Sequence, residues 1–414
     1  MAANAPSKVL NVGILGIGVG GAEILPALES LPNDVKIVAG ADIEPRVCNA
    51  FAERYPGTHV YDSAEKLCAD PDVDAVWIST PNRFHAPHTI MAANAGKHVV
   101  VEKPMAISLD EGKAMVEAAE KNGTKLLAGH TMSFSTPIRA MRKVIQSGEI
   151  GDVRAINIWA YSDWLLRPRT SDELDPTQGG GIPYRQGPHQ IDTIRLLGGG
   201  KVKSVRAVTG QWSKVRPIVG YYSALFEFEN GASANIVHNG YGYFLTHELV
   251  PWGDDSQRYT APERVEIRKA LYAGTRNEYE DKNDLRIGGR AEEQVFRSQG
   301  PKEWLPSDLG MVIVSCEQGD IRHSAYGIQI YSNEGRRDIN LNEVQGVVGR
   351  RAEILELVNS INNNTPVYHD GRWGLATLEC CLAVLESGRE HQEIQLKHQI
   401  PVHDEYDSDF RLPS

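Results

Sequence analysis

Three glycines near the N-terminus constrain the fold of this chain more than any other feature. Gly16, Gly18 and Gly21 follow an apolar run at residues 8–15, typical of a buried parallel strand, and precede a helix-like segment at residues 21–30. The first glycine permits a tight turn, the second lets backbone N–H groups approach a pyrophosphate, and the third lets helix and strand pack closely. The pattern predicts a Rossmann unit that binds a dinucleotide through Gly16, Ile17, Gly18, Val19, Gly20 and Gly21.

The acid that follows this motif bears on which dinucleotide is bound. Asp42 ends the next predicted strand, residues 35–41. Its carboxylate can accept hydrogen bonds from a ribose diol, and its charge would repel a 2′-phosphate. We therefore expect NAD rather than NADP, although Arg46 lies close enough in sequence to keep NADP open.

Strands alternate with helices of about a dozen residues as far as residue 129, which predicts a doubly wound parallel sheet in a domain spanning 1–129. Two of its strands end in polar residues. The strand at 73–79 is followed by Thr80, Pro81 and Asn82, with His85 shortly after, and the strand at 98–101 by Glu102, Lys103 and Pro104. Ligands of open α/β sheets lie at the carboxyl ends of the strands, so we expect these residues to face the cofactor.

The pattern changes after residue 129. Longer runs that alternate apolar and polar residues, at 153–161, 202–212, 221–228 and 232–239, predict a large, mostly antiparallel open sheet in a C-terminal α+β domain, residues 130–397. Residues 245–310 lack a sustained period and are interpreted as an insertion, and 398–414 as a polar tail. Amphipathic helices are expected at 350–362 and 375–387.

Composition excludes several classes of protein. The 414 residues suffice for two domains, and the formal net charge of −11 argues against a nucleic-acid partner. No stretch of 18 apolar residues predicts a membrane span, the N-terminus has no signal-peptide pattern, and no C-x-x-C pair occurs among Cys48, Cys68, Cys316, Cys380 and Cys381. We expect a cytoplasmic protein with reduced thiols. His85 and His88 have helical spacing, but no third ligand is evident, so no metal is predicted.

The order of these motifs resembles the Gfo/Idh/MocA oxidoreductases. The resemblance rests on the glycine motif, Asp42, Thr80-Pro81-Asn82-x-x-His85, Glu102-Lys103-Pro104 and Gly187-Pro188-His189-x-x-Asp192. It implies an NAD(P)-binding Rossmann domain, a C-terminal α/β domain, and hydride transfer to or from a carbinol carbon. It also implies that Lys103 and His189 are the acid/base residues. A lysine is a poor base near neutral pH unless its pKa is lowered, whereas a histidine is already poised there, so we expect His189 to take the proton and Lys103 to orient the oxygen. The roles could be reversed.

One position departs from the family pattern. Many relatives carry an aspartate four residues before the second-domain histidine, and here that residue is Arg185. Arginine is suited to bidentate recognition of a carboxylate, which predicts an anionic substrate. The stretch 184–243, with Arg216-Pro217 and Asn239-Gly240-Tyr241-Gly242, resembles the branch that oxidises carboxylated aromatic cis-dihydrodiols of the phthalate 4,5-dihydrodiol type. The predicted substrate-binding residues are Tyr184, Arg185, Asp192, Arg167 and Arg169.

Three alternatives remain open at this point. A sugar or cyclitol dehydrogenase of the same family would share every motif. A dinucleotide-sensing protein without turnover would retain the glycine turn but would not need Lys103 and His189. An oxidoreductase that holds its cofactor tightly and recycles it between two substrates would also fit. The open face of the second predicted sheet leads us to expect a homo-oligomer, a dimer or tetramer, because such a face often pairs with its own copy.

Overall fold

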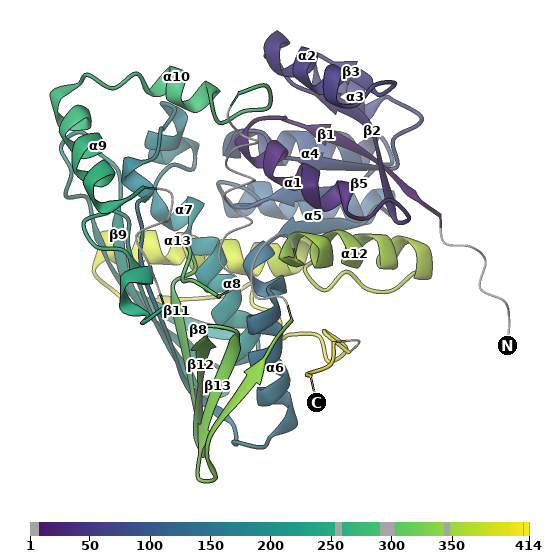
Figure 1. Cartoon of the computed structure of the whole chain (residues 1–414). Coiled ribbons are helices and arrows are strands. Elements are labelled where there is room, and N and C mark those ends of the chain that lie inside the picture. The colour runs from purple at the N-terminus through teal and green to yellow at the C-terminus, as the bar shows by residue number, and fades with distance from the viewer. Residues whose placement is uncertain (1–7, 253–258, 290–302, 343–347, 409, 414) are drawn as a thin grey trace, which may run out of the picture. The chain divides into compact units, whose positions relative to one another are not determined.

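The computed structural model describes residues 8–252, 259–289, 303–342, 348–408 and 410–413 (Figure 1). The chain divides into two compact units. The first comprises residues 1–130, 280–300 and 347–375, and the second 131–279, 301–346 and 376–414. The sequence analysis had assigned everything from 130 to 397 to one domain. In the structure, two later segments, within 280–300 and 347–375, belong to the first unit. The local sequence of these segments does not indicate which hydrophobic core they join.

The first unit is built on a parallel sheet of six strands in the order β3-β2-β1-β4-β5-β6, as the apolar runs predict. The strands are β1 (Leu10–Leu15), β2 (Val35–Ala41), β3 (His59–Tyr61), β4 (Ala75–Ile78), β5 (His98–Glu102) and β6 (Leu126–Gly129). The strand order reverses between β1 and β4. Their carboxyl ends therefore define the switch point at which such sheets bind ligands.

Helices connect these strands and bury the sheet. They are α1 (Val19–Glu29), α2 (Pro45–Arg54), α3 (Ala64–Cys68), α4 (His85–Asn94), α5 (Leu109–Asn122) and the returning α12 (Val348–Asn363). Ser108 caps α5 through the N–H of Glu111, and Gly123 ends it in the left-handed conformation. The α12 residues Ile354 and Leu357 lie in the same hydrophobic core as β1 and α1. This packing explains why α12 belongs to the first unit.

The second unit is built on a nine-stranded sheet in the order β14-β13-β12-β11-β7-β10-β9-β8-β15. Its strands are β7 (Val153–Tyr161), β8 (Val202–Gly210), β9 (Tyr221–Phe228), β10 (Ser233–Asn239), β11 (Met311–Cys316), β12 (Gly319–Ser324), β13 (Gly327–Ser332), β14 (Gly335–Asn340) and β15 (Ile394–Gln395). Among the described strands of this sheet, only β7 and β10 pair in parallel. The predicted fold class, a Rossmann domain plus a mostly antiparallel sheet, is thus confirmed. The sequence analysis did not anticipate β11–β14.

The other described α-helices are α6 (Thr136–Ser147), α7 (Ile182–Arg185), α8 (Gly187–Gly198), α9 (Ala261–Ala273), α10 (Glu278–Asn283) and α13 (Gly371–Glu390). Short 3₁₀ segments are η1 (Asn82–Phe84), η2 (Thr131–Phe134), η3 (Trp164–Leu166), η4 (Asp172–Leu174), η5 (Pro176–Gln178) and η6 (Thr246–Leu249). Every residue of α8 is buried. Among the described helices, none has the length and apolar character that a membrane span requires.

The predicted insertion at 245–310 contains regular structure that the sequence analysis missed. Helix α9 begins at a capping box formed by Thr260 and Glu263 and ends at Gly274 in the left-handed conformation. These are recognisable start and stop signals, but the helix has no strong apolar stripe to draw attention to them. The parts of the insertion at 253–258 and 290–302 lie outside the described residues.

Candidate active site

The glycine turn has two positions that packing requires and one that it does not. Gly16 has φ +85°, and a Cβ there would lie 2.8 Å from the backbone nitrogen of Thr80. A Cβ on Gly21 would lie 2.2 Å from the carbonyl oxygen of Gly16. A Cβ on Gly18, by contrast, would meet no atom within 4 Å. Gly18 therefore leaves space beside the turn, as a bound pyrophosphate would need, and the turn fits a dinucleotide.

The Asp42 carboxylate connects the end of β2 to this turn. One oxygen accepts the N–H of Ile17 at 2.8 Å and the other accepts the N–H of Glu44 at 2.9 Å. The N-cap residue of α1 is Gly18, which has no side chain that could accept a hydrogen bond from the N–H groups of the first helical turn. N–H donors at the start of a helix and a carboxylate held beside them are the groups that pyrophosphate and ribose require.

His85 joins two of the predicted strand ends. Its Nδ1 lies 2.7 Å from the carbonyl oxygen of Pro104, and its Nε2 lies 2.7 Å from that of Thr80. The Thr80 hydroxyl lies 3.1 Å from Nδ1 of His88. His85 is buried, and both of its ring nitrogens contact backbone carbonyl oxygens. Because one carbonyl follows β4 and the other follows β5, His85 links the two loops. Asn82 is also buried, at the start of η1.

Glu102, at the end of β5, is held by an ion pair. Arg350 of α12 lies 2.6 Å from the Glu102 carboxylate and 3.3 Å from that of Glu353. Burial alone would lower the pKa of Arg350, but the two carboxylates raise it above its usual value. Lys103 follows and is half-buried, and the peptide bond between it and Pro104 is cis. The strand end that carries Lys103 is thus fixed by a charge network inside the first unit.

In the second unit, α8 carries His189 on a fully buried helix. His189 is 6% exposed. The next residue, Gln190, accepts a hydrogen bond from the Tyr222 hydroxyl at 2.5 Å and donates to the Leu309 carbonyl at 3.1 Å. These contacts anchor α8 to the sheet and to the chain before β11. They fix the helix that presents His189.

Asp192, one turn further along α8, is fully buried. Its carboxylate accepts hydrogen bonds from the hydroxyl of Ser133 and, at 3.4 Å, from that of Thr377. These contacts with neighbouring elements indicate that Asp192 stabilises the helix packing. Its predicted contact with substrate stays a prediction.

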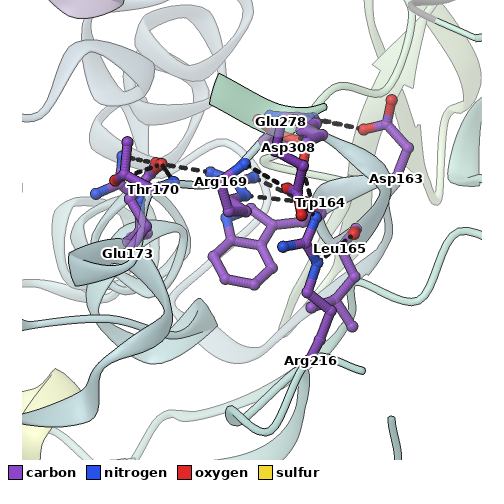
Figure 2. A network of polar contacts seen from close by, with 11 residues as sticks. Asp163, Trp164, Leu165, Arg169, Thr170, Glu173, Arg216, Glu278 and Asp308 are labelled. Carbon is purple, nitrogen blue, oxygen red and sulfur yellow. Dashed lines mark hydrogen bonds and ion pairs between the residues drawn. The ribbon is translucent and has the colours of Figure 1, made fainter. Parts of the chain in front are cut away.

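The arginines predicted to bind substrate differ in their surroundings. Arg167 lies 2.8 Å from the Asp163 carboxylate and 2.6 Å from that of Asp308. Arg169 is 5% exposed and lies 3.0 Å from the Glu173 carboxylate (Figure 2). Both are therefore engaged in ion pairs within the protein. Arg169 and Glu173 are four residues apart, a spacing at which opposite charges often pair, and the sequence analysis did not use it.

Arg185 is the most exposed of the three, with 27% of its side chain accessible, and it lies 2.9 Å from the same Glu173 carboxylate. Its neighbour Tyr184 is buried. Arg216, which the sequence analysis named in its resemblance to the dihydrodiol branch, is buried and pairs with Glu278 at 2.5 Å. Arg185 is thus the predicted substrate-binding arginine that stays most open to solvent.

The two units together define a class of protein. A Rossmann sheet with a dinucleotide turn, joined to a large open sheet that carries a histidine helix, is the architecture of a nicotinamide-dependent oxidoreductase. Residues 10–130 match the family described as an oxidoreductase family with an NAD-binding Rossmann fold, and residues 138–244 match the GFO/IDH/MocA C-terminal domain. The chain belongs to the Gfo/Idh/MocA oxidoreductase family and is an enzyme that binds NAD(P).

Individual relatives support this assignment over most of the chain. A 1-carboxy-3-chloro-3,4-dihydroxycyclohexa-1,5-diene dehydrogenase of Comamonas testosteroni is 34% identical over 92% of this chain and 95% of its own length. A D-glucoside 3-dehydrogenase of Escherichia coli is 30% identical over 56% of this chain and 68% of its own. The crystal structure of a dehydrogenase of Bordetella bronchiseptica matches with a TM-score of 0.85 at 34% identity, covering 94% of this chain and all of that one.

Proposed function

We propose that this enzyme is an NAD-dependent dehydrogenase that oxidises one carbinol of a carboxylated aromatic cis-dihydrodiol, of the phthalate 4,5-dihydrodiol type, to the corresponding catechol. The observation that carries the proposal is Arg185, a partly exposed guanidinium four residues before His189. A guanidinium can bind a carboxylate through two parallel charge-assisted hydrogen bonds. The relative from Comamonas testosteroni adds support, because the substrate in its name has both a carboxyl group and a dihydroxycyclohexadiene ring.

The reaction balances without any further reactant. Bound NAD would supply the hydride acceptor for the carbinol carbon. The hydroxyl proton of the same carbinol passes to His189, and Lys103 orients and polarises that oxygen. The resulting hydroxyketone loses the proton from its neighbouring carbon and gains one on oxygen, and this gives the aromatic catechol. The gain of aromaticity drives the reaction toward the product.

The preference for NAD over NADP rests on Asp42. The carboxylate already accepts the N–H groups of Ile17 and Glu44, and an ionised carboxylate offers about four acceptor positions, so it retains capacity for a ribose diol. Its negative charge disfavours a 2′-phosphate. The exposed guanidinium of Arg46 makes a long hydrogen bond, 3.5 Å, to the Gly288 carbonyl oxygen. We expect a higher kcat/KM with NAD than with NADP.

The test is a turnover assay at 340 nm. The purified protein is given NAD and, separately, a carboxylated cis-dihydrodiol, a neutral cis-dihydrodiol, and a panel of sugars and cyclitols. We expect NADH formation with the carboxylated dihydrodiol at a kcat/KM well above that with the others. Turnover of glycosides or cyclitols alone would replace the proposal with its main alternative, which the Escherichia coli relative favours.

We also propose that the chain forms a homo-oligomer through the second sheet. Trp159, Val208 and Leu225 point to one face of that sheet by register and are 44%, 55% and 46% exposed. An open face with large apolar side chains is suited to pairing with its own copy. Light scattering after size exclusion should give a dimer or tetramer, and Leu225→Glu should shift it toward monomer.

A further inference from the structure

A buried hydrogen-bond network surrounds the side chain of Gln190, the residue after His189 on α8. The amide oxygen Oε1 of Gln190 accepts a hydrogen bond from the Tyr222 hydroxyl at 2.5 Å and lies 3.2 Å from Nδ1 of His238. The Nε2 atom of Gln190 donates to the Leu309 carbonyl oxygen at 3.1 Å. Gln190, Tyr222 and His238 are fully buried. The amide of Gln190 is therefore held by β9, by β10 and by the chain before β11.

The register of the sheet explains why two ring side chains meet at one amide oxygen. Tyr222 on β9 and His238 on β10 are directly opposite each other in an antiparallel pair. Such residues point to the same face of a sheet, with Cβ atoms about 4.5–5.5 Å apart. The centroids of the two rings are 6.1 Å apart. The two strands thus present their polar atoms side by side to the helix that carries Gln190.

The network determines which nitrogen of His238 carries hydrogen. A carbonyl oxygen only accepts, so the Gln190 atom that faces Leu309 is the NH2 group. The amide oxygen therefore faces His238, and Nδ1 of His238 donates to it. Nε2 is then the acceptor, and the hydroxyl of Ser162, 3.0 Å away, donates to it. Burial lowers the pKa of His238 to about 4, so the ring is neutral at neutral pH.

The position of Gln190 on α8 determines what this network holds. Successive residues of an α-helix are about 100° apart around the axis, so Gln190 lies about 100° from His189. Asp192, which accepts hydrogen bonds from Ser133 and Thr377, lies about 60° from His189 on the other side. Every residue of α8 is buried, so no contrast between an apolar and a polar face fixes its rotation. Directional hydrogen bonds on both sides of His189 do so instead.

A small rotation of α8 would be enough to displace His189. Side chains extend about 5–6 Å from a helix axis, so a rotation of about 10° moves their ends by about 1 Å. A displacement of that size at a reacting group can lower a rate about 100-fold. Apolar packing is not directional and tolerates such a rotation, whereas a fully satisfied polar network selects one arrangement.

We propose that His238 and Gln190 are positioning residues that fix the rotation of α8 and thereby the place of the His189 imidazole. The inference rests on the proposed function, in which His189 takes the hydroxyl proton. His238 acts through the amide of Gln190, and Gln190 acts through the helix backbone. An apolar side chain at either position would fill the space without setting the angle.

Substitutions at His238 separate hydrogen bonding from packing. His238→Phe keeps a buried ring but removes the donor to Gln190 and the acceptor of Ser162. We expect its kcat to fall about 10–100-fold, with KM and NAD affinity within about 2-fold of wild type. His238→Asn offers an amide N–H near the place of Nδ1 and should recover at least about 3-fold of the loss. Tyr222→Phe removes only a hydroxyl and should lower kcat about 3–10-fold.

The matched control is the same substitution at a second buried histidine of this sheet. His323 lies on β12, and its ring nitrogens have no hydrogen-bond partner within the part of the chain that the structure describes. His323→Phe should therefore leave kcat within about 2-fold of wild type at neutral pH. Each variant is assayed with the compound that the wild type oxidises in the substrate panel.

A double substitution tests whether His238 acts through His189. Once His189→Asn has removed the imidazole, there is no imidazole left to position. Adding His238→Phe to His189→Asn should therefore lower kcat by less than about 2-fold further. A general loss of structure would multiply the two effects in full.

Crystal structures of the wild type and of both His238 variants give a readout that needs no substrate. In His238→Phe, the His189 imidazole should move by about 1 Å with α8 still folded, and in His238→Asn it should lie closer to its wild-type place. An imidazole that keeps its place in His238→Phe, a wild-type kcat in that variant, or effects that multiply in full would each overturn the inference. If His189→Asn keeps the wild-type kcat, or no compound of the panel is oxidised, the proposed function fails, and the place of the imidazole in the crystal structures alone decides the positioning role.

Discussion

The guanidinium of Arg350 lies 2.6 Å from the carboxylate of Glu102, the residue directly before Lys103. The pair joins residues almost 250 positions apart in the chain, the returning helix α12 and the end of β5. Glu353 on the same helix adds a second carboxylate at 3.3 Å. The position of Lys103 therefore depends on a helix that lies far from it in sequence.

Arg350→Met should destabilise the first unit by about 3–5 kcal/mol, since it leaves two buried carboxylates without their cation. Urea unfolding followed by fluorescence measures the loss. Arg336→Met, which removes an exposed partner of Asp338, should cost less than about 1 kcal/mol. Equal midpoints for the two variants would contradict the role given to Arg350.

The glycine turn predicts opposite results for two neighbouring substitutions. Gly21→Ala places a Cβ 2.2 Å from the Gly16 carbonyl oxygen and should destabilise the protein by about 1–3 kcal/mol or more. Gly18→Ala meets no protein atom within 4 Å, so the melting temperature should stay close to wild type while NAD affinity falls. Thermal unfolding without NAD measures the stability of each variant, and the shift in melting temperature on adding NAD measures its NAD affinity. Normal NAD affinity in Gly18→Ala would show that the space beside Gly18 is not used.

Lys103→Met should lower kcat about 100–10,000-fold, the usual contribution of a positioned acid or base, while NAD binding survives. His189→Asn should have an effect of similar size. Stopped-flow NADH formation and NAD titration by protein fluorescence separate chemistry from binding. Full activity of the Lys103 variant would remove that residue from the reaction.

His323 predicts an acid sensitivity that has nothing to do with catalysis. It is fully buried, stacks on Trp304 at 3.7 Å, and burial lowers its pKa to about 3. In the unfolded chain His323 has a pKa of about 6.5. Between pH 6.5 and 3 it is therefore protonated in the unfolded chain and neutral in the folded protein. Stability is therefore present above pH 6.5 and is lost as the pH falls through this window, by about 2 kcal/mol at pH 5 for this group.

His323→Phe retains an aromatic ring beside Trp304 and cannot take up a proton. The difference in unfolding free energy between pH 7.5 and pH 5 should shrink by about 2 kcal/mol in this variant. A residual difference is expected, because burial also lowers the pKa of His238, to about 4. An unchanged difference would mean that His323 is protonated without unfolding.

Local patterns were enough to predict much of the fold. The spans of β2, β7 and β9 coincide with the runs predicted at 35–41, 153–161 and 221–228. The strand pairing β11–β14 was not predicted, because its members are short and follow a stretch without periodicity. The same holds for α9, whose apolar stripe is weak even though its capping signals are clear.

The sequence by itself determined the dinucleotide turn. Its backbone conformation and close packing require glycine at fixed positions within one short segment, so the pattern can be recognised locally. It also identified Arg185 as an unusual residue. Only the tertiary structure decided what surrounds each charge. Arg167, Arg169 and Arg185 look alike in sequence, yet the first two are paired with buried carboxylates, and the third shares Glu173 and stays partly open to solvent. Charge partners are set by which distant segments pack together, and no local pattern of residues encodes that.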